Sequence, residues 1–175
     1  MEIISLRSLK CINNIFHFSS TLSKFFFMIP FSKNIKNIVI TGGSGFIGTS
    51  LVKKLLEETN IKIFNIDKLS YASNYQISNQ YIHSNQYNFL KVDLYESKEI
   101  YSAIKLCNPD LVFHLAAESH VDKSITEPKV FLNSNVIGTF NLLEALLFHW
   151  DLMSKERKKN FRLIHVSTDE VFGSI

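Results

Sequence analysis

Cysteine, proline and glycine are scarce in this chain, and each scarcity excludes a class of protein. The two cysteines, Cys11 and Cys107, are too few for a disulfide scaffold, which favours a reducing, cytoplasmic setting. Three prolines and six glycines exclude collagen-like and linker-dominated architectures. No uninterrupted apolar run approaches the roughly 20 residues of a membrane-spanning helix. We therefore expect no membrane partner.

A basic surface pattern is also lacking. Residues 1–36 hold five of the 19 basic residues and one of the 16 acidic residues, which leaves 14 basic and 15 acidic residues from position 37 onward. This balance gives no electrostatic footprint for nucleic acid, so no nucleic-acid partner is expected. The apolar content of 46% suits one globular domain.

Residues 1–36 differ in composition from the rest of the chain. Ser, Asn and Phe dominate them, Glu2 is their one acid, and no clear apolar period runs through residues 12–31. We interpret them as a leader or N-terminal extension, followed by one domain over residues 37–175. Two alternatives stay open: an organellar transit peptide, and a mis-started leader with Met28 as the true start.

From residue 37, short apolar runs alternate with helical patterns. The predicted strands cover residues 38–40, 61–66, 89–92, 111–116 and 161–166, and the predicted helices cover residues 46–56, 97–107 and 128–150. Apolar strands separated by crossovers require a parallel sheet covered on both faces. The sequence therefore predicts an α/β fold, a doubly wound parallel sheet of Rossmann type, with one crossover hidden in the polar stretch 69–88.

Three finer expectations follow from the same patterns. Phe46 and Ile47 belong to the apolar face of the first helix. The basic cluster at residues 155–159 is interpreted as a solvated helix end. The last predicted strand lacks a further neighbour in this chain, which predicts an uncovered sheet edge.

Four of the six glycines lie between Gly42 and Gly48, directly after a predicted strand and at the start of a helix. Glycine removes the Cβ that would block a tight turn, and the N–H groups of a helix start attract a pyrophosphate. Asp67 closes the next strand, 19 residues beyond Gly48, where a carboxylate can accept the hydroxyls of an adenosine ribose. Because a carboxylate there repels a 2′-phosphate, the sequence predicts NAD as cofactor rather than NADP.

Two further strand ends carry candidate residues. Ala116 and Ala117 follow the fourth strand, where small side chains let a flat cofactor lie against the backbone. His114, inside that apolar run, is predicted to be a core histidine. Asp169 and Glu170 follow the fifth strand and suit paired acid and base chemistry, with a solvated helix cap as the alternative. No metal site is predicted.

Together these stretches resemble the extended short-chain dehydrogenase/reductase superfamily and, within it, the dTDP-glucose 4,6-dehydratases. Residues 41–48 carry the superfamily signature, and residues 67–74, 116–124 and 167–173 carry the narrower match. The resemblance implies NAD, a dTDP-glucose substrate and a cytoplasmic homodimer. It implies substrate contacts from Ser119 and His120. It implies cofactor contacts from Gly42, Gly45, Phe46, Ile47, Gly48, Asp67, Lys68, Asp93, Leu94, Leu115, Ala116 and Ala117.

The resemblance also implies a hydro-lyase reaction that gives a 4-keto-6-deoxy sugar nucleotide. Thr168 would hydrogen-bond the 4-oxygen while a hydride passes from carbon 4 to NAD. Glu170 would then remove the proton on carbon 5, and Asp169 would protonate the departing 6-hydroxyl. The hydride finally returns to carbon 6.

One departure from the superfamily concerns its catalytic Tyr-x-x-x-Lys pair, which should follow residues 168–170. The chain stops at Ile175 and all its tyrosines precede the fourth predicted strand, so this pair and the sugar-nucleotide domain are expected to be absent. We therefore expect an amino-terminal piece of a dehydratase that is inactive alone. The alternatives are an NAD-binding module without catalysis, another epimerase or dehydratase of the superfamily, and the product of a broken gene.

Overall fold

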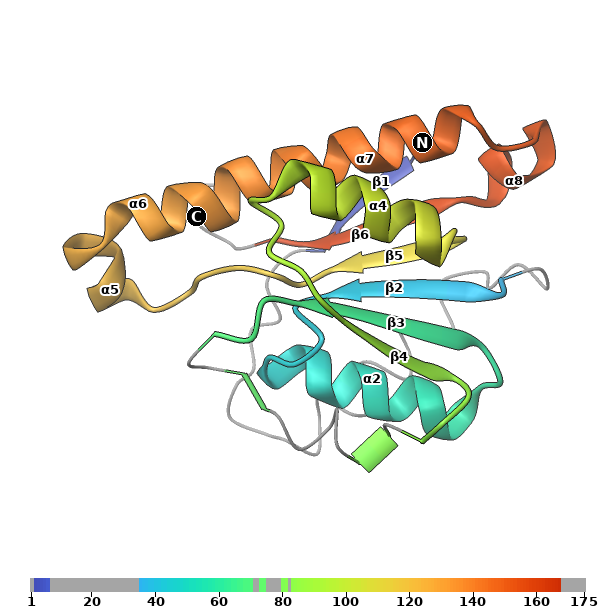
Figure 1. Cartoon of the computed structure of the whole chain (residues 1–175), viewed down its shortest axis with the longest axis horizontal. Coiled ribbons are helices and arrows are strands. Elements are labelled where there is room, and N and C mark those ends of the chain that lie inside the picture. Colours follow the sequence, from blue (N-terminus) through green and yellow to red (C-terminus); the bar gives the residue numbers. More distant parts are fainter. Residues whose placement is uncertain (1, 7–34, 71–72, 75–79, 82, 168–175) are drawn as a thin grey trace.

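A six-stranded parallel sheet forms the centre of the computed structural model, which describes residues 2–6, 35–70, 73–74, 80–81 and 83–167 (Figure 1). The strand order is β1-β6-β5-β2-β3-β4, and each neighbouring pair is parallel. The strands are β1 (Glu2–Leu6), β2 (Asn37–Thr41), β3 (Lys62–Asp67), β4 (Tyr87–Lys91), β5 (Leu111–His114) and β6 (Arg162–Val166). The predicted doubly wound α/β class is confirmed.

Helices cover both faces of this sheet. They are α2 (Phe46–Glu58), α4 (Ser97–Cys107), α5 (Val121–Thr126), α6 (Pro128–Phe131), the π-helix η1 (Leu132–Gly138), α7 (Thr139–Asp151) and α8 (Lys155–Asn160). Helix α2 lies on one face, while α4 and α7 pack together on the other (Figure 1). Successive strand residues point to opposite faces, so Val39 belongs to the core under α4 and α7 and Ile40 to the core under α2.

The bounds of the elements differ from the predicted ones by small amounts. Strand β4 begins at Tyr87, before the predicted residue 89, and β5 ends at His114, before the predicted residue 116. Residues 80–81 are helical, and residues 71–72, 75–79 and 82 of the connection that was predicted to hide a crossover lie outside the described residues.

The first turn of α2 departs from its predicted role in the core. Phe46 is 77% exposed and Ile47 39% exposed, whereas Leu51, Val52 and Leu55 are buried. The physical reason is the position of this turn. It directly follows residues 42–45, which we call the glycine loop, at the carboxyl ends of the strands, and it precedes the part of α2 that packs against the sheet. The apolar period alone does not show where along a helix its packing partner begins.

The predicted single helix over residues 128–150 is divided into α6, η1 and α7. The π-helical turns hold Asn133, Ser134 and Asn135, short polar residues that favour hydrogen bonds to nearby backbone over a regular helix. By length and composition alone, residues Pro128–Asp151 could cross a membrane, which is weak evidence because core helices pass the same test. In the structure, Leu142, Ala145 and Leu146 pack into the core between the sheet and α4.

Strand β1 is an element that the sequence analysis missed. It pairs in parallel with β6, from Glu2 opposite Arg162 to Leu6 opposite Val166. The outer edge of β6 is therefore covered, and the prediction of an uncovered edge is wrong. The local sequence could not show this strand, because so short a strand can be identified only from the strand it pairs with. That partner, β6, lies near the other end of the sequence. The domain boundary at residue 36 stays a prediction.

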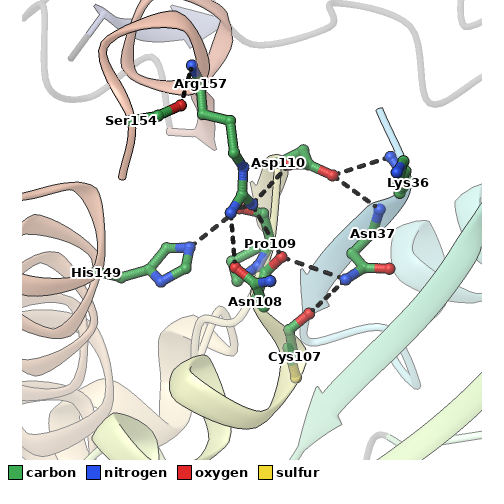
Figure 2. A network of polar contacts seen from close by, with 9 residues as sticks. All are labelled: Lys36, Asn37, Cys107, Asn108, Pro109, Asp110, His149, Ser154 and Arg157. Carbon is green, nitrogen blue, oxygen red and sulfur yellow. Dashed lines mark hydrogen bonds and ion pairs between the residues drawn. The ribbon is translucent and has the colours of Figure 1, made fainter. Parts of the chain in front are cut away.

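A polar network joins the amino ends of β2 and β5 to α8 (Figure 2). Arg157 of α8 donates to Asp110 Oδ1 from Nε at 3.1 Å and from Nη2 at 2.7 Å. The second oxygen of Asp110 accepts the backbone N–H groups of Lys36 and Asn37 at 2.9 and 3.2 Å. The interpretation of residues 155–159 as a solvated helix end is therefore wrong for Arg157, whose partners come from a distant part of the sequence.

Candidate cofactor site

In the sheet, β3 and β4 lie on one side of β2, whereas β5 and β6 lie on its other side. The direction of the connections between strands therefore reverses between β2 and β5. Loops that leave the carboxyl ends of two such strands diverge and leave a crevice, the usual ligand position in doubly wound sheets. A cavity of about 110 Å³ lies at this edge. Its lining includes these predicted cofactor residues: Gly42, Gly45, Asp67, Lys68, Asp93, Leu94, Leu115, Ala116 and Ala117.

The other predicted site residues lie elsewhere. Phe46, Ile47 and Gly48 form the start of α2 beside the glycine loop, outside the cavity lining. Ser119 and His120 are exposed in the segment between β5 and α5 and do not line it either. Residues 168–170, the predicted catalytic triplet, lie outside the described residues. The roles predicted for all of these residues stay predictions.

The glycine loop makes a close approach between β2 and the segment after β5. Gly42 has a φ of +71°, and a Cβ on it would lie 2.7 Å from both the backbone N and Cα of Ala116. A Cβ on Gly48 would collide with the carbonyl oxygen of Gly42. Glycine is therefore required at both positions, which leaves a backbone surface beside the helix start that suits a phosphate group.

Asn65 contacts the glycine loop through Ser44, and the sequence analysis missed it. It is fully buried on β3, and its Nδ2 donates to Ser44 Oγ at 3.1 Å and to the Tyr87 hydroxyl at 2.9 Å. Its side chain also occupies the space that a Cβ on Gly43 would need. One signal was present: a polar amide interrupts an otherwise apolar strand.

Asp67 joins the loop to the end of β3. Its Oδ2 accepts the N–H of Ser44 at 3.0 Å, and its Oδ1 accepts the N–H of Leu69 at 2.8 Å and the hydroxyl of Ser73 at 3.3 Å. The carboxylate is 8% exposed and lines the cavity. Since two carboxylate oxygens offer about four acceptor positions, the group can also accept a ligand hydroxyl. The glycine loop, the helix start and this acceptor together fit a dinucleotide such as NAD.

A cluster of four side chains, which we call the clasp, borders the same cavity and joins three segments of the chain. Lys68 Nζ pairs with Glu118 Oε1 at 2.7 Å and donates to Ser134 Oγ at 2.6 Å. Asn135 accepts the N–H of Glu118 at 2.8 Å and donates to its carbonyl oxygen at 2.9 Å. The sequence analysis missed Glu118, Ser134 and Asn135, because no local pattern reveals contacts between residues so far apart.

His114 lies beneath the cavity and is confirmed as a core histidine. Its Nδ1 lies 2.7 Å from Thr41 Oγ1 and its Nε2 2.9 Å from Thr139 Oγ1. Burial, together with the nearby His165, lowers the pKa of His114 from 6.5 to about 3. The imidazole is therefore neutral at physiological pH and connects β2, β5 and α7.

The described part of the chain also bears on two other kinds of site, a metal centre and a Tyr-x-x-x-Lys pair. Among these residues, no group of three or more His, Cys, Asp or Glu side chains could hold a metal ion. The Tyr-x-x-x-Lys spacing occurs twice, at Tyr87–Lys91 in β4 and at Tyr101–Lys105 in α4, in both cases before residues 168–170 rather than after them. None of these four residues lines the cofactor cavity.

Comparisons with known proteins agree with this geometry. The family model described as GDP-mannose 4,6 dehydratase matches residues 39–175. A dTDP-glucose 4,6-dehydratase of Salmonella typhimurium is 46% identical over 138 residues, which cover 79% of this chain and 38% of that protein. The chain thus spans less than half the length of the curated relatives it matches.

Solved structures give the same result. The dTDP-glucose 4,6-dehydratase DesIV of Streptomyces venezuelae, with NAD bound, has a TM-score of 0.66 and 33% identity over 79% of this chain and 41% of that one. The UDP-glucose 4-epimerase of Thermotoga maritima has a TM-score of 0.58 and 32% identity over 65% of this chain and 34% of that one. The resemblance inferred from the sequence is confirmed, and the chain belongs to the GDP-mannose 4,6 dehydratase family.

Proposed function

We propose that the cavity at the carboxyl edge of the sheet binds NAD. One observation carries this proposal: Gly42 and Asp67 meet at a single cavity, which puts a close backbone turn, a helix start and a hydroxyl acceptor together. The pyrophosphate would lie at the start of α2, and Asp67 would accept the hydroxyls of the adenosine ribose. Asp93, which lines the same cavity, would lie near the adenine.

We further propose that the chain is the cofactor-binding part of a dTDP-glucose 4,6-dehydratase. The support is the identity of 41–46% with several proteins of that name, together with the Asp169–Glu170 pair in the sequence. When bound, NAD supplies a reversible hydride acceptor. Thr168 would hold the 4-oxygen of the sugar, Glu170 would take the proton from carbon 5, and Asp169 would give a proton to the leaving hydroxyl.

The remaining parts of the proposal concern assembly and location. A homodimer would use the helical stretch 128–151, on which Leu132, Val136 and Phe140 are more than half exposed. A cytoplasmic location suits Cys107, a buried free thiol whose pKa is raised to about 12 by burial. Neither a nucleic acid nor a membrane is part of the proposed function.

Calorimetric titration of the chain with NAD tests the binding proposal. We expect saturable binding at one site, weaker binding of NADP, and NAD binding weakened about 100-fold after Asp67 is replaced by Ala. Absence of NAD binding in chain that is folded by circular dichroism would contradict it.

The reaction is tested separately, on the gene product read through and beyond the Ile175 codon. We expect dTDP-glucose to give the 4-keto-6-deoxy product. Epimerisation of UDP-galactose without that product would instead support an epimerase, the alternative that the structural likeness to a UDP-glucose 4-epimerase favours. A stop codon directly after Ile175, with NAD binding retained, would support a binding module without catalysis.

A further inference from the structure

The clasp contains the one cation among the described residues that line the cofactor cavity. That cation is Lys68, which directly follows Asp67. A lysine beside the ribose-binding carboxylate is the kind of group that attracts a 2′-phosphate, so its position alone would favour NADP. In the structure, however, the ammonium group of this lysine already contacts two protein acceptors.

Lys68 is held by acceptors from two distant segments. Glu118 Oε1 lies 2.7 Å from its Nζ, and the Glu118 side chain is only 10% exposed. Ser134 Oγ accepts from the same Nζ at 2.6 Å. A charge-assisted hydrogen bond that is mostly shielded from solvent is among the stronger side-chain contacts, so it competes with an incoming phosphate for the ammonium group.

Glu118 is itself fixed in place. Asn135 of η1 binds both the N–H and the carbonyl oxygen of Glu118, at 2.8 and 2.9 Å. The π-helical turns place Ser134 and Asn135 side by side, so that one neighbour holds Lys68 and the other holds its partner. These two hydrogen bonds fix the backbone of Glu118 beside η1, so the side chain of Glu118 extends from a fixed position next to Lys68.

The charge of the cavity points the same way. Its charged lining residues in the described part of the chain are Asp67, Asp93, Glu118 and Lys68. The ion pair cancels Lys68 against Glu118 and leaves two carboxylates without a balancing cation in the lining. A 2′-phosphate, which carries up to two negative charges, is repelled there, whereas ribose hydroxyls are not.

We propose that Glu118 is a positioning residue for cofactor specificity: by holding Lys68, it prevents that lysine from binding a 2′-phosphate and makes the cavity select NAD over NADP. This inference rests on the proposed NAD site. It assigns the specificity to two groups, the Asp67 carboxylate and the Glu118–Lys68 pair, rather than to Asp67 alone.

The test compares the dissociation constants of NAD and NADP, measured by calorimetry on the whole chain and on four variants. Glu118→Gln keeps the shape of the side chain and removes its charge. We expect the preference for NAD to fall at least tenfold, mainly through tighter NADP binding. In the double variant Lys68→Met with Glu118→Gln, the gain in NADP binding should disappear, because the lysine that causes it is gone.

Glu57→Gln is the matched control, since Glu57 also faces a lysine, Lys53, but on the exposed surface of α2. It should leave the preference within twofold of the unaltered chain, which separates a local effect from a change in net charge. Ser134→Ala loosens Lys68 without a charge change and should shift the preference in the same direction as Glu118→Gln, by a smaller factor. If Glu118→Gln fails to fold, the cofactor preference of Ser134→Ala tests the inference instead.

The outcomes separate this inference from the proposed function. If the chain binds neither NAD nor NADP, the proposed function is overturned and the inference with it. If the chain binds NAD but Glu118→Gln and Ser134→Ala leave the preference unchanged, the inference alone is overturned. It is equally overturned if the double variant binds NADP as tightly as Glu118→Gln does.

Discussion

At each end of the strands, a lysine or arginine side chain pairs with a carboxylate from a distant segment. The two ends differ in whether neighbouring groups can still bind a ligand. At the amino edge, Arg157 and Asp110 lie 2.7 Å apart, and both oxygens of Asp110 are occupied by protein donors (Figure 2). At the carboxyl edge, Lys68 and Glu118 lie at the same distance of 2.7 Å, but beside a glycine loop and a helix start that can still bind an anion.

Cavity size does not distinguish these two edges. A hollow of about 370 Å³ lies beside Arg157, larger than the cavity of about 110 Å³ beside Asp67. The difference lies in the groups present at each end. At the carboxyl ends of β2 and β5, the glycine loop leads into the start of α2. At the amino ends of these strands, residues 36–37, 108–110 and 157 hydrogen-bond to one another. A charged pair in a doubly wound sheet is therefore informative about function only together with the strand end it occupies.

The largest expected effect comes from exchanging the two aspartates, one at each edge, for Ala. Asp67→Ala should weaken NAD binding about 100-fold, near 2.7 kcal/mol, because it removes the ribose acceptor and the acceptor for Ser44 N–H. Asp110→Ala should lower the free energy of unfolding by about 2 kcal/mol and leave NAD affinity unchanged within about twofold. Calorimetry and urea unfolding measure the two quantities. Equal losses of NAD affinity in both variants would contradict the division of roles.

His114 offers a further test of the carboxyl end of the sheet, because it is the last residue of β5 and its protonation depends on pH. Its folded pKa is lowered from 6.5 to about 3, so the unfolded chain takes up the proton first as the pH falls. The stability that depends on neutral His114 is complete above pH 6.5 and is lost between 6.5 and about 3, at about 1.4 kcal/mol per pH unit.

The variant His114→Gln cannot take up this proton. Between pH 7 and pH 5, the unaltered chain should therefore lose about 2 kcal/mol more stability than His114→Gln, as measured by urea unfolding at several pH values. Parallel pH profiles for the two proteins would show that the imidazole of His114 does not stay neutral in the folded state.

The smallest effect is expected from Arg157→Lys at the amino edge. Lysine keeps the charge but loses the branched set of donors with which Arg157 contacts Asp110 and Asn108 at once. Because the arginine side chain is 38% exposed, the expected loss of stability is only about 1 kcal/mol, with no change in NAD affinity. A loss of NAD affinity with unchanged stability would reverse the roles assigned to the two edges.

The sequence was informative where a function is encoded locally. The glycine loop could be predicted because close backbone approach requires glycine at Gly42 and Gly48, and Asp67 because it ends the next apolar strand. All three residues were located by short-range spacing, without knowledge of any partner.

The contacts that could not be predicted join residues far apart in the chain. The pairs Lys68–Glu118 and Arg157–Asp110 each depend on how separate elements pack, and a charged residue looks the same in a solvated loop and in a buried pair. Strand β1 was missed for the same reason, since only its pairing with β6 distinguishes it from an extension. Within η1, Asn135 forms two hydrogen bonds with the backbone of Glu118 in the segment after β5, a contact that the helical period does not reveal.

Amide hydrogen exchange with and without NAD tests the central claim most directly, because it observes both edges of the sheet in one experiment. We predict slower exchange on NAD binding at residues 42–49, 66–69, 93–94 and 115–118, with no change at residues 107–110 and 154–160. Slower exchange at the amino edge, or no change at the glycine loop at saturating NAD, would contradict the assignment of the cofactor site to the carboxyl edge.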